Sequence, residues 1–352
     1  MNIIYVEDCC EILDSKRVPI TASERKRGEY PYYGANGIQD YVSDYIFDDE
    51  LVLLAEDGGN FGSKERPIAY KVSGKCWVNN HAHVLKPRAC INVDYLCYAL
   101  MFYNVDGMVN GATRQKLTQA AMRKMQIPFR RMEEQVHIVD ELNRLVKIKE
   151  QRQQELILLD TLIKARFVEL FGDMTLARND WEKLLLCDVC DVRDGTHDSP
   201  KYFTEGYPLI TSKNVSGGKI DFSDCNLICE EDYNKINQRS KVDVGDILMP
   251  MIGTVGKPVI VDSQKKFAIK NVALIKFREN SAVVNSFIKV LLESDYFDRE
   301  VINKVRGGTQ KFISLGDIRK LNICLPPIKL QNQFAAFVNE IDKSKLQKFS
   351  AA

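Results

Sequence analysis

The sequence predicts an α+β protein in which two similar globular domains are separated by a long antiparallel helical spacer of coiled-coil type. Residues 111–143 match residues 307–339 at a constant offset of 196, with seven identities in 33 positions. Unrelated segments of this length share about two. The offset far exceeds the period of about 20–50 residues that marks a solenoid, so it indicates two copies of one domain.

The order of segments follows from this repeat. Residues 1–130 alternate short β-type runs with turn residues and form the first predicted domain. Residues 131–172 form a spacer helix, because apolar residues recur at spacings of three and four and no proline or glycine interrupts them before Gly172. Residues 173–327 form the second predicted domain, and residues 328–352 a second, shortened spacer helix.

Composition limits the class of protein. The chain has 352 residues, of which 45% are hydrophobic and 28% charged, as in ordinary globular proteins. Its net charge is +1, so any nucleic-acid-binding surface must be local. We expect no membrane span, because no apolar run approaches 18 residues. We expect no secretion signal, because Glu7 and Asp8 lie within the first ten residues and no apolar core run occurs there. The ten scattered cysteines indicate a reducing compartment, and we expect a cytoplasmic protein.

Catalytic motifs are missing from the sequence. It contains no phosphate-binding P-loop, no nucleophile elbow and no amino-methyltransferase signature, so we predict no catalytic residues. We also predict no metal site. Cys187 and Cys190 lie in a stretch, 184–192, that is expected to be a strand and would point them to opposite faces. His81 and His83 are interpreted as a core or surface pair.

Polar loops carry the strongest functional signal. Arg193–Pro200, Thr211–Gly218 and Gly34–Gly37 combine turn residues with cations, hydroxyls and amides. Gly111–Lys116 and Gly307–Lys311 place threonine, glutamine and a cation at matched positions of the repeat. Such groups contact phosphates and base edges. Plain turn chemistry explains any one loop, but recurrence in both halves favours a binding role.

At these residues the chain resembles the specificity subunit of type I DNA restriction–modification systems. Three segments are similar to sequence motifs that recur in the target recognition domains of that family: Tyr30–Ile38, Trp77–Leu85 and Arg193–His197. Gly111–Gln135 resembles the exit from a recognition domain into the spacer helix. The resemblance covers nearly the whole chain.

This resemblance implies a subunit without catalytic activity, in which each recognition domain binds one half of a bipartite DNA target. It also implies two methyltransferase subunits that use S-adenosylmethionine, and restriction subunits that use ATP and Mg. We therefore expect these cofactors on the partner subunits and none on this chain. The residues expected to contact DNA are Asn36, Arg114, Lys116, His197, Lys213, Asn214, Thr309, Gln310 and Lys311.

The second spacer helix is expected to be shorter than the first, because a full copy would run past Ala352. As an antiparallel partner it would face the C-terminal half of the first helix. We hypothesise that a methyltransferase subunit or another chain covers the N-terminal half, at Val139, Leu142, Leu145 and Val146. Alternatively, the sequence is truncated.

Two other functions remain open from the sequence. The chain could be a self-contained DNA-modifying or DNA-cleaving enzyme with an unrecognised active site, which the missing catalytic motifs disfavour. It could also be a bridging scaffold that no longer binds DNA, which the repeated polar loops disfavour.

Overall fold

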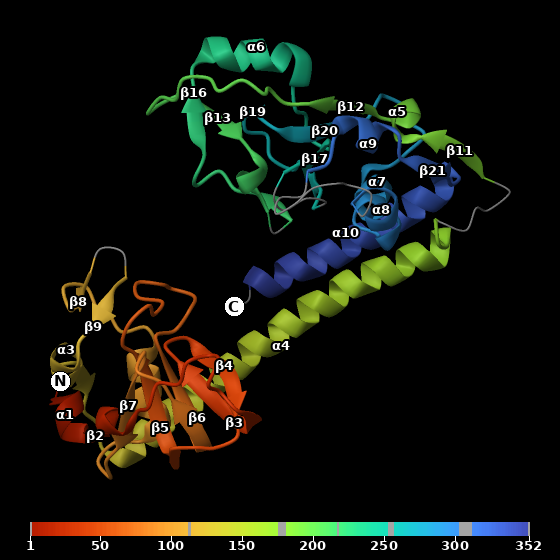
Figure 1. The fold of residues 1–352 in the computed structure, drawn as a ribbon. Helices are drawn as coiled ribbons and strands as arrows, with labels where there is room; N and C mark the ends of the chain where they lie inside the picture. The colour runs from red at the N-terminus through yellow and green to blue at the C-terminus, as the bar shows by residue number, and fades with distance from the viewer. Residues whose placement is uncertain are drawn as a thin grey trace. The chain divides into compact units, whose positions relative to one another are not determined.

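The computed structural model describes residues 2–111, 114–174, 181–216, 218–252, 257–302 and 312–350. The chain divides into two units, Met1–Gln151 (unit 1) and Arg152–Ala352 (unit 2), and the boundary lies within one long helix, α4 (Met132–Phe171). Each unit combines strands and helices (Figure 1), which confirms the predicted α+β class. Across the described ranges, every helix is too short or too polar to cross a lipid bilayer.

Unit 1 is built on a six-stranded sheet, and its described residues form four more strands outside that sheet. The strands of the unit are β1 (Ile3–Tyr5), β2 (Cys10–Ile12), β3 (Arg27–Gly34), β4 (Gly37–Val42), β5 (Phe47–Ala55), β6 (Ala69–Val78), β7 (Ala82–Pro87), β8 (Val109–Asn110), β9 (Lys116–Leu117) and β10 (Gln126–Pro128). Its shorter helices are α1 (Val6–Cys9), η1 (Asp14–Lys16), α2 (Val93–Met101) and α3 (Gln119–Arg123). The sheet order is β2-β7-β5-β6-β3-β4, with only β3 and β6 parallel.

The central strand β5 explains why this sheet has two buried faces. Its side chains alternate between the faces, as in any extended strand. Val52 and Leu54 join a cluster that includes helix α2, whereas Leu51 and Leu53 join the cluster on the other face. All four side chains are fully buried.

Unit 2 repeats the same connections. Its strands are β11 (Glu182–Leu185), β12 (Asp191–Asp194), β13 (Tyr207–Ile210), β14 (Val215–Ser216), β15 (Lys219–Ile220), β16 (Asn226–Ile228), β17 (Ile247–Pro250), β18 (Val259–Ile260), β19 (Ala268–Ile269), β20 (Val272–Lys276) and β21 (Asn322–Leu325). Its helices are α5 (Leu186–Val189), η2 (Ser212–Asn214), α6 (Glu230–Ser240), α7 (Asn285–Leu292), α8 (Asp295–Glu300), α9 (Leu315–Arg319) and α10 (Ile328–Ser350). Strand β13 pairs with β16 and, in parallel, with β19, as β3 pairs with β4 and β6.

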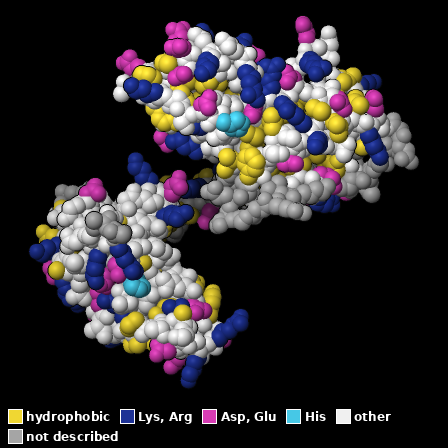
Figure 2. Space-filling view, turned by 45° about the horizontal axis from the view of Figure 1, so that its top comes forward, with side chains coloured by type: hydrophobic (Ala, Val, Ile, Leu, Met, Phe, Trp, Pro, Cys, Tyr) yellow, Lys and Arg dark blue, Asp and Glu magenta, His cyan; other side chains and the backbone are white. Residues whose placement is uncertain are grey.

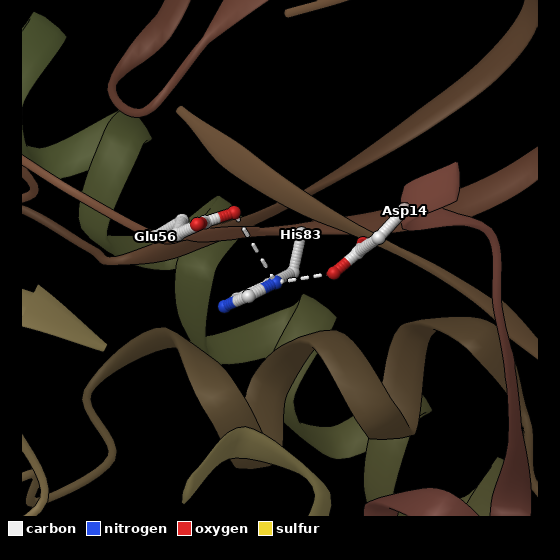
Figure 3. Close-up of side chains that lie close together, drawn as sticks. All are labelled: Asp14, Glu56 and His83. Atoms are coloured by element: carbon white, nitrogen blue, oxygen red, sulfur yellow. Dashed lines mark hydrogen bonds and ion pairs between the residues drawn. The ribbon is translucent and has the colours of Figure 1, made fainter. Parts of the chain in front are cut away.

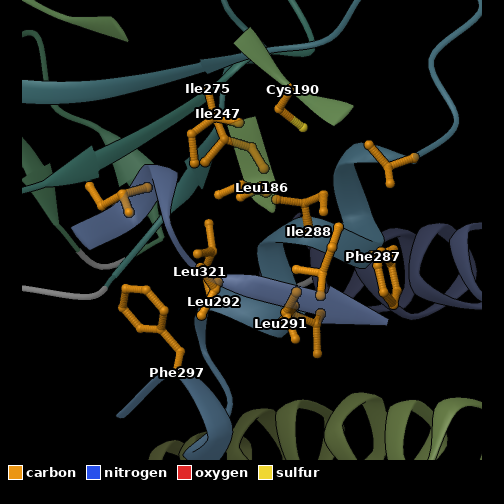
Figure 4. Packing of buried hydrophobic residues seen from close by; sticks show 14 of the residues in the cluster. Leu186, Cys190, Ile247, Ile275, Phe287, Ile288, Leu291, Leu292, Phe297 and Leu321 are labelled. Carbon is orange, nitrogen blue, oxygen red and sulfur yellow. The ribbon is translucent and has the colours of Figure 1, made fainter. Parts of the chain in front are cut away.

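The largest core of unit 2 lies where α7 packs against strands and α9 (Figure 4). Ile288 and Leu291 of α7 share one cluster with Ile247 and Ile275 of the sheet, while the Phe287 ring lies against Phe167 and Phe171 of α4, and all of these side chains are buried. This core therefore joins the α7 helix to the β12-β20-β17-β18 sheet.

The expected strand over residues 184–192 is wrong in its middle. Strand β11 ends at Leu185, and a helical turn, α5, separates it from β12. The carboxylate of Asp188 accepts a hydrogen bond of 2.9 Å from the Leu185 backbone N–H and so starts the turn. The run of apolar residues resembled a strand because both the turn and the flanking strands are partly buried.

One buried glutamine near the start of each long helix fixes that start against its unit. Gln135 of α4 accepts a 2.8 Å hydrogen bond from the N–H of Asn92, the N-cap residue of helix α2. Its equivalent in the repeat, Gln331 of α10, accepts one of 2.9 Å from the N–H of Val284, the N-cap residue of α7. Each amide also donates to two backbone carbonyls of its own unit. The matched glutamines of the sequence repeat are therefore structural.

The two long helices pair in the antiparallel sense that the sequence predicts (Figure 1). The Phe334 ring of α10 lies 5.5 Å from Phe167 and 5.4 Å from Phe171 of α4, between ring centroids. Further along α10, Lys345 donates a 2.7 Å hydrogen bond to Asp160, which lies earlier in α4. Helix α4 ends at Phe171, and Gly172 follows in the left-handed conformation (φ 76°), as expected of a helix stop.

Candidate nucleic-acid interface

Three of the residues expected to bind DNA meet in unit 1 around the loop that follows β5. Asn36 donates a 3.0 Å hydrogen bond to the carbonyl of Gly58. Arg114 pairs with Asp57 at 2.9 Å between Nη2 and Oδ1, and Lys116 pairs with Glu56 at 3.0 Å. All three side chains reach the surface. The loop thus gathers cations and an amide from segments that are far apart in the sequence.

A backbone hydrogen bond holds the segment at Lys116–Leu117 (the exit loop) against the residue that follows β5. Unit 2 has an equivalent hydrogen bond. The N–H of Leu117 donates to the carbonyl of Glu56 at 2.7 Å, and that of Ile313 donates to Met251 at 2.9 Å. The offset of 196 between Leu117 and Ile313 is that of the sequence repeat. Thr309, Gln310 and Lys311, the other expected contacts of this loop, lie outside the described residues.

A buried polar network supports the unit 1 loop (Figure 3). Asp14 accepts hydrogen bonds from His83 Nδ1 at 2.6 Å, from the Val84 N–H at 2.8 Å and from Gln119 at 3.0 Å. Arg17 donates to Glu56 at 2.6 Å. Burial alone raises the pKa of Asp14, but these hydrogen bonds outweigh it and hold the pKa below the ordinary 3.8.

Asp14, Glu56 and His83 form the one cluster of potential metal ligands found in the described part of the chain. The hydrogen bonds give this cluster another role. His83 Nδ1 faces Asp14, and its Nε2 lies 2.9 Å from the Leu117 carbonyl, so both ring nitrogens are placed to donate. A metal would need one of these nitrogens as a lone-pair donor. The cluster therefore ties η1, β5 and β7 to the exit loop.

His81 and Asp57 are members of this surface that the sequence did not identify. His81 Nδ1 lies 2.5 Å from Asp57 Oδ1, and Arg114 Nη2 lies 3.4 Å from the same nitrogen. The sequence offered only the His81-x-His83 spacing, which suggested a pair. The structure separates the two rings, since His83 is fully buried and His81 is partly exposed.

In unit 2, His197 occupies the position that Arg17 has in unit 1. His197 is the third residue after Asp194, which ends β12. Arg17 is the third residue after Asp14, which follows the equivalent strand β2. His197 Nε2 contacts Asp194 at 2.8 Å, and its Nδ1 contacts Asn271 Oδ1 at 2.8 Å. These hydrogen bonds, to Asn271 and then Asp194, raise the pKa of His197 above 6.5. Its side chain is 64% exposed, so the cation faces solvent.

The neighbouring loop gives one correction. Asn214 was expected to contact DNA, but it is only 2% exposed and its amide is fully used. It accepts from Thr211 Oγ1 at 2.9 Å and donates to the carbonyl of Asp224 at 2.8 Å, so it closes the loop from inside. Lys213 is exposed and pairs with Asp224 at 3.2 Å. Of the two residues, only Lys213 is free to reach a ligand.

The expected subunit interface on α4 is also corrected at one position. Val139 is 6% exposed and packs in the core of unit 1, so its own unit covers it. Leu142 is half-buried. Leu145 and Val146 are 61% and 42% exposed, which leaves two large apolar side chains on the helix surface.

Charges of both signs are spread over the surface. Lysine and arginine side chains alternate with aspartate and glutamate on the visible face of each unit (Figure 2). This mixture agrees with the net charge of +1. Any contact with a polyanion therefore depends on local groups such as those above.

Comparison with known proteins follows the same division of the chain. A family model described as the type I restriction modification DNA specificity domain matches residues 1–158 and 178–349. The putative type I restriction enzyme specificity subunit S.HindORF215P of Haemophilus influenzae is 27% identical over 96% of this chain and 86% of its own length. The MjaVIII specificity subunit of Methanocaldococcus jannaschii is 23% identical over 97% and 86%.

Solved structures share the fold. The crystal structure of a type I restriction–modification S subunit from M. genitalium matches 99% of this chain and 91% of that chain, with a TM-score of 0.57 and 14% identity. A structure concerned with complex assembly of a type I restriction–modification system matches 99% and 92%, with a TM-score of 0.56 and 15% identity.

Proposed function

Because this chain belongs to the type I restriction–modification DNA specificity family, we propose that each of its units binds one half of a bipartite DNA target. The observation that carries this proposal is the gathering of Asn36, Arg114 and Lys116 at one loop of unit 1, with His197 displayed in unit 2. Charged and amide side chains of this kind bind phosphates and base edges. The chain is a non-catalytic subunit, and nothing in the comparisons favours a self-contained enzyme.

The partners are methyltransferase and restriction subunits. We propose that two methyltransferase subunits bind each chain and carry S-adenosylmethionine, while the restriction subunits carry ATP and Mg. The exposed Leu145 and Val146 support an additional interface on α4, with a methyltransferase subunit or a second copy of this chain. We place the assembly in the cytoplasm, where such subunits meet chromosomal DNA.

A competition experiment tests the recognition role. The chain is purified with its methyltransferase subunits, and its target is taken from methylome sequencing of a host that carries it. We expect the target duplex to bind at least about 1,000-fold more tightly than a scrambled duplex. Equal affinity for both duplexes contradicts the proposal. DNA cleavage or methylation by the chain alone would support the enzyme alternative.

Affinity for DNA is expected to depend on pH through His197. The raised pKa keeps the ring cationic below its folded value, and the charge is lost as pH rises through that value. Between about pH 6 and pH 9 we expect the affinity of the complex to fall about fivefold, the worth of one exposed charged contact. His197→Gln removes this dependence by lowering affinity at acid pH.

His197→Arg is the matched control for this measurement. It keeps a cation at all pH values, as Arg17 does in unit 1, so affinity should stay high and flat. A wild-type profile that is identical to that of His197→Gln would show that the ring makes no contact with DNA.

A further inference from the structure

Helix α6 is an addition that unit 2 has and unit 1 lacks. Strand β4 of unit 1 joins β5 through residues 43–46. The equivalent strands of unit 2, β16 and β17, are joined by residues 229–246, which contain α6 (Glu230–Ser240). The pairing of β3 and β13 with their neighbours fixes this equivalence. The shared fold therefore does not require α6.

One face of α6 packs on the small sheet β16-β13-β19. Tyr233 stacks on Tyr207 of β13 with 4.1 Å between ring centroids. Ile236, one turn later, packs against the cluster formed by Leu209 and Ile228. Residues at spacings of three and four share a helix face, so this side of α6 is fixed to the sheet.

The neighbouring side of α6 carries two cations toward the loop of His197. Lys235 and Arg239 are four residues apart and line one cavity of about 190 Å³ together with Thr196 and Ser199. Arg239 Nη2 donates to Asp194, and Arg193 Nη1 donates to the Arg239 carbonyl at 2.7 Å. These bonds hold the end of α6 against the loop.

The charges around this cavity are mixed, and its cations come from both α6 and the loop of His197. Besides Lys235 and Arg239, the Lys270 ammonium lies 2.5 Å from Ser199 Oγ at the same loop, and His197 is adjacent in sequence. Two carboxylates, Asp198 and Asp232, also line the cavity.

Asp194 is already engaged by His197 and Arg239 and does not offset the other cations. Lys235 is exposed, and no ion pair to it occurs among the residues that the structure describes. Cations beside hydroxyl groups are the usual surroundings of a DNA phosphate.

We propose that α6 is a phosphate-binding element for the half-target of unit 2, with Lys235 as the contact and Arg239 as the residue that positions the helix. This proposal rests on the proposed function, because the phosphates are those of the bound duplex. It assigns to unit 2 a backbone contact without an equivalent helix in unit 1. The contact places the duplex beside the loop of His197, while specificity for bases lies in other residues.

Salt dependence of DNA binding tests Lys235 directly. In the complex with methyltransferase subunits, Lys235→Gln should make the slope of log affinity against log salt shallower by about 0.9, the value for one phosphate contact. The loss of affinity between about 50 and 200 mM salt should therefore be about 3.5-fold smaller than for wild type. Affinity at low salt should fall equally for the target and a scrambled duplex.

Lys183→Gln is the matched control, since Lys183 is an exposed lysine of β11, away from α6 in the same unit (Figure 1). It should leave the slope unchanged. Thermal unfolding of both variants should match wild type, which separates contact from folding. Lys235→Glu should weaken binding further than Lys235→Gln.

Two results overturn the proposal. An unchanged slope in Lys235→Gln removes the phosphate contact, and a loss confined to one base pair of the target assigns Lys235 to base recognition instead. The proposed function fails separately, when the wild-type complex does not distinguish its target from the scrambled duplex. If the wild-type complex distinguishes the two duplexes but Lys235→Gln leaves the salt slope unchanged, only the proposed role of α6 is contradicted.

Discussion

Replacing Asp14 by alanine destabilises unit 1 by about 3–5 kcal/mol, the usual cost of removing one partner from a buried charged network. The carboxylate is 7% exposed and accepts hydrogen bonds from His83, Val84 and Gln119. Without it, the buried ring of His83 loses its nearer anionic partner and keeps Glu56, at 3.6 Å, while the backbone N–H of Val84 is left unpaired. Denaturant unfolding measures the change.

The chain offers a reporter for this unit. It has two tryptophans, Trp77 in unit 1 and Trp181 in unit 2, so a Trp181→Phe background leaves Trp77 as the only fluorophore of its kind. Asp106→Ala, an exposed aspartate of unit 1, is the control and should change stability by less than about 0.5 kcal/mol. Equal effects of Asp14→Ala and Asp106→Ala would mean that the network contributes nothing.

The pKa of Asp14 sets the direction of the pH dependence. Its folded value lies below the ordinary 3.8, so the carboxylate stabilises unit 1 fully above that pH. The stabilisation is lost as pH falls through the folded value. Asp14→Ala should therefore unfold with a weaker dependence on acid than wild type.

Replacing Leu145 by aspartate should weaken methyltransferase binding by at least about 2 kcal/mol, or about 30-fold, without unfolding the chain. Leu145 is 61% exposed on α4, so the substitution changes folding by less than about 0.5 kcal/mol. In the complex, the new carboxylate would be buried at the interface without a partner, which weakens binding. Titration calorimetry with the methyltransferase subunit measures the loss.

Ile157→Asp is the control, because Ile157 is a similarly exposed apolar residue of α4 (55%) outside the expected interface. It should bind the methyltransferase subunit as wild type does. Unchanged binding by Leu145→Asp argues that a second copy of this chain, or no protein, covers this part of α4. Light scattering of the isolated chain distinguishes those two outcomes.

Local patterns were enough to predict much of the fold. The repeat at an offset of 196 predicted two similar domains, and the backbone contacts of Leu117 and Ile313 recur at that same offset. The spacing of apolar residues predicted α4, and Gly172 marked its end, because both depend on residues close together in the chain.

Burial inside a loop could not be predicted. Asn214 and Lys213 are adjacent polar residues of one turn, yet Asn214 points inward and Lys213 outward. Their direction depends on Thr211 and on the carbonyl of Asp224, ten residues away, with which Asn214 bonds. Val139 shows the same limit, since only the packed core of unit 1 reveals that it is covered.

Pairs that are distant in sequence were also missed. His81 and Asp57 meet because β5 and β7 are neighbours in the sheet, which no local spacing reveals. The position of helix α6 beside the loop of His197 is likewise visible only in the structure. The sequence therefore predicted the candidate DNA-binding residues one loop at a time. In the structure, side chains from separate segments come together to form the candidate surface.

The glutamines at the two helix starts keep each joint between a unit and its long helix within that unit. Among the described residues, the side-chain hydrogen bonds of Gln331 go to Val284, Ala282 and Pro326, all within unit 2. A crossover placed after Gln135 or Gln331 would carry the whole joint with it and leave the helix beyond it unaltered. We expect a chain recombined at such a boundary to keep the connection between unit and helix intact.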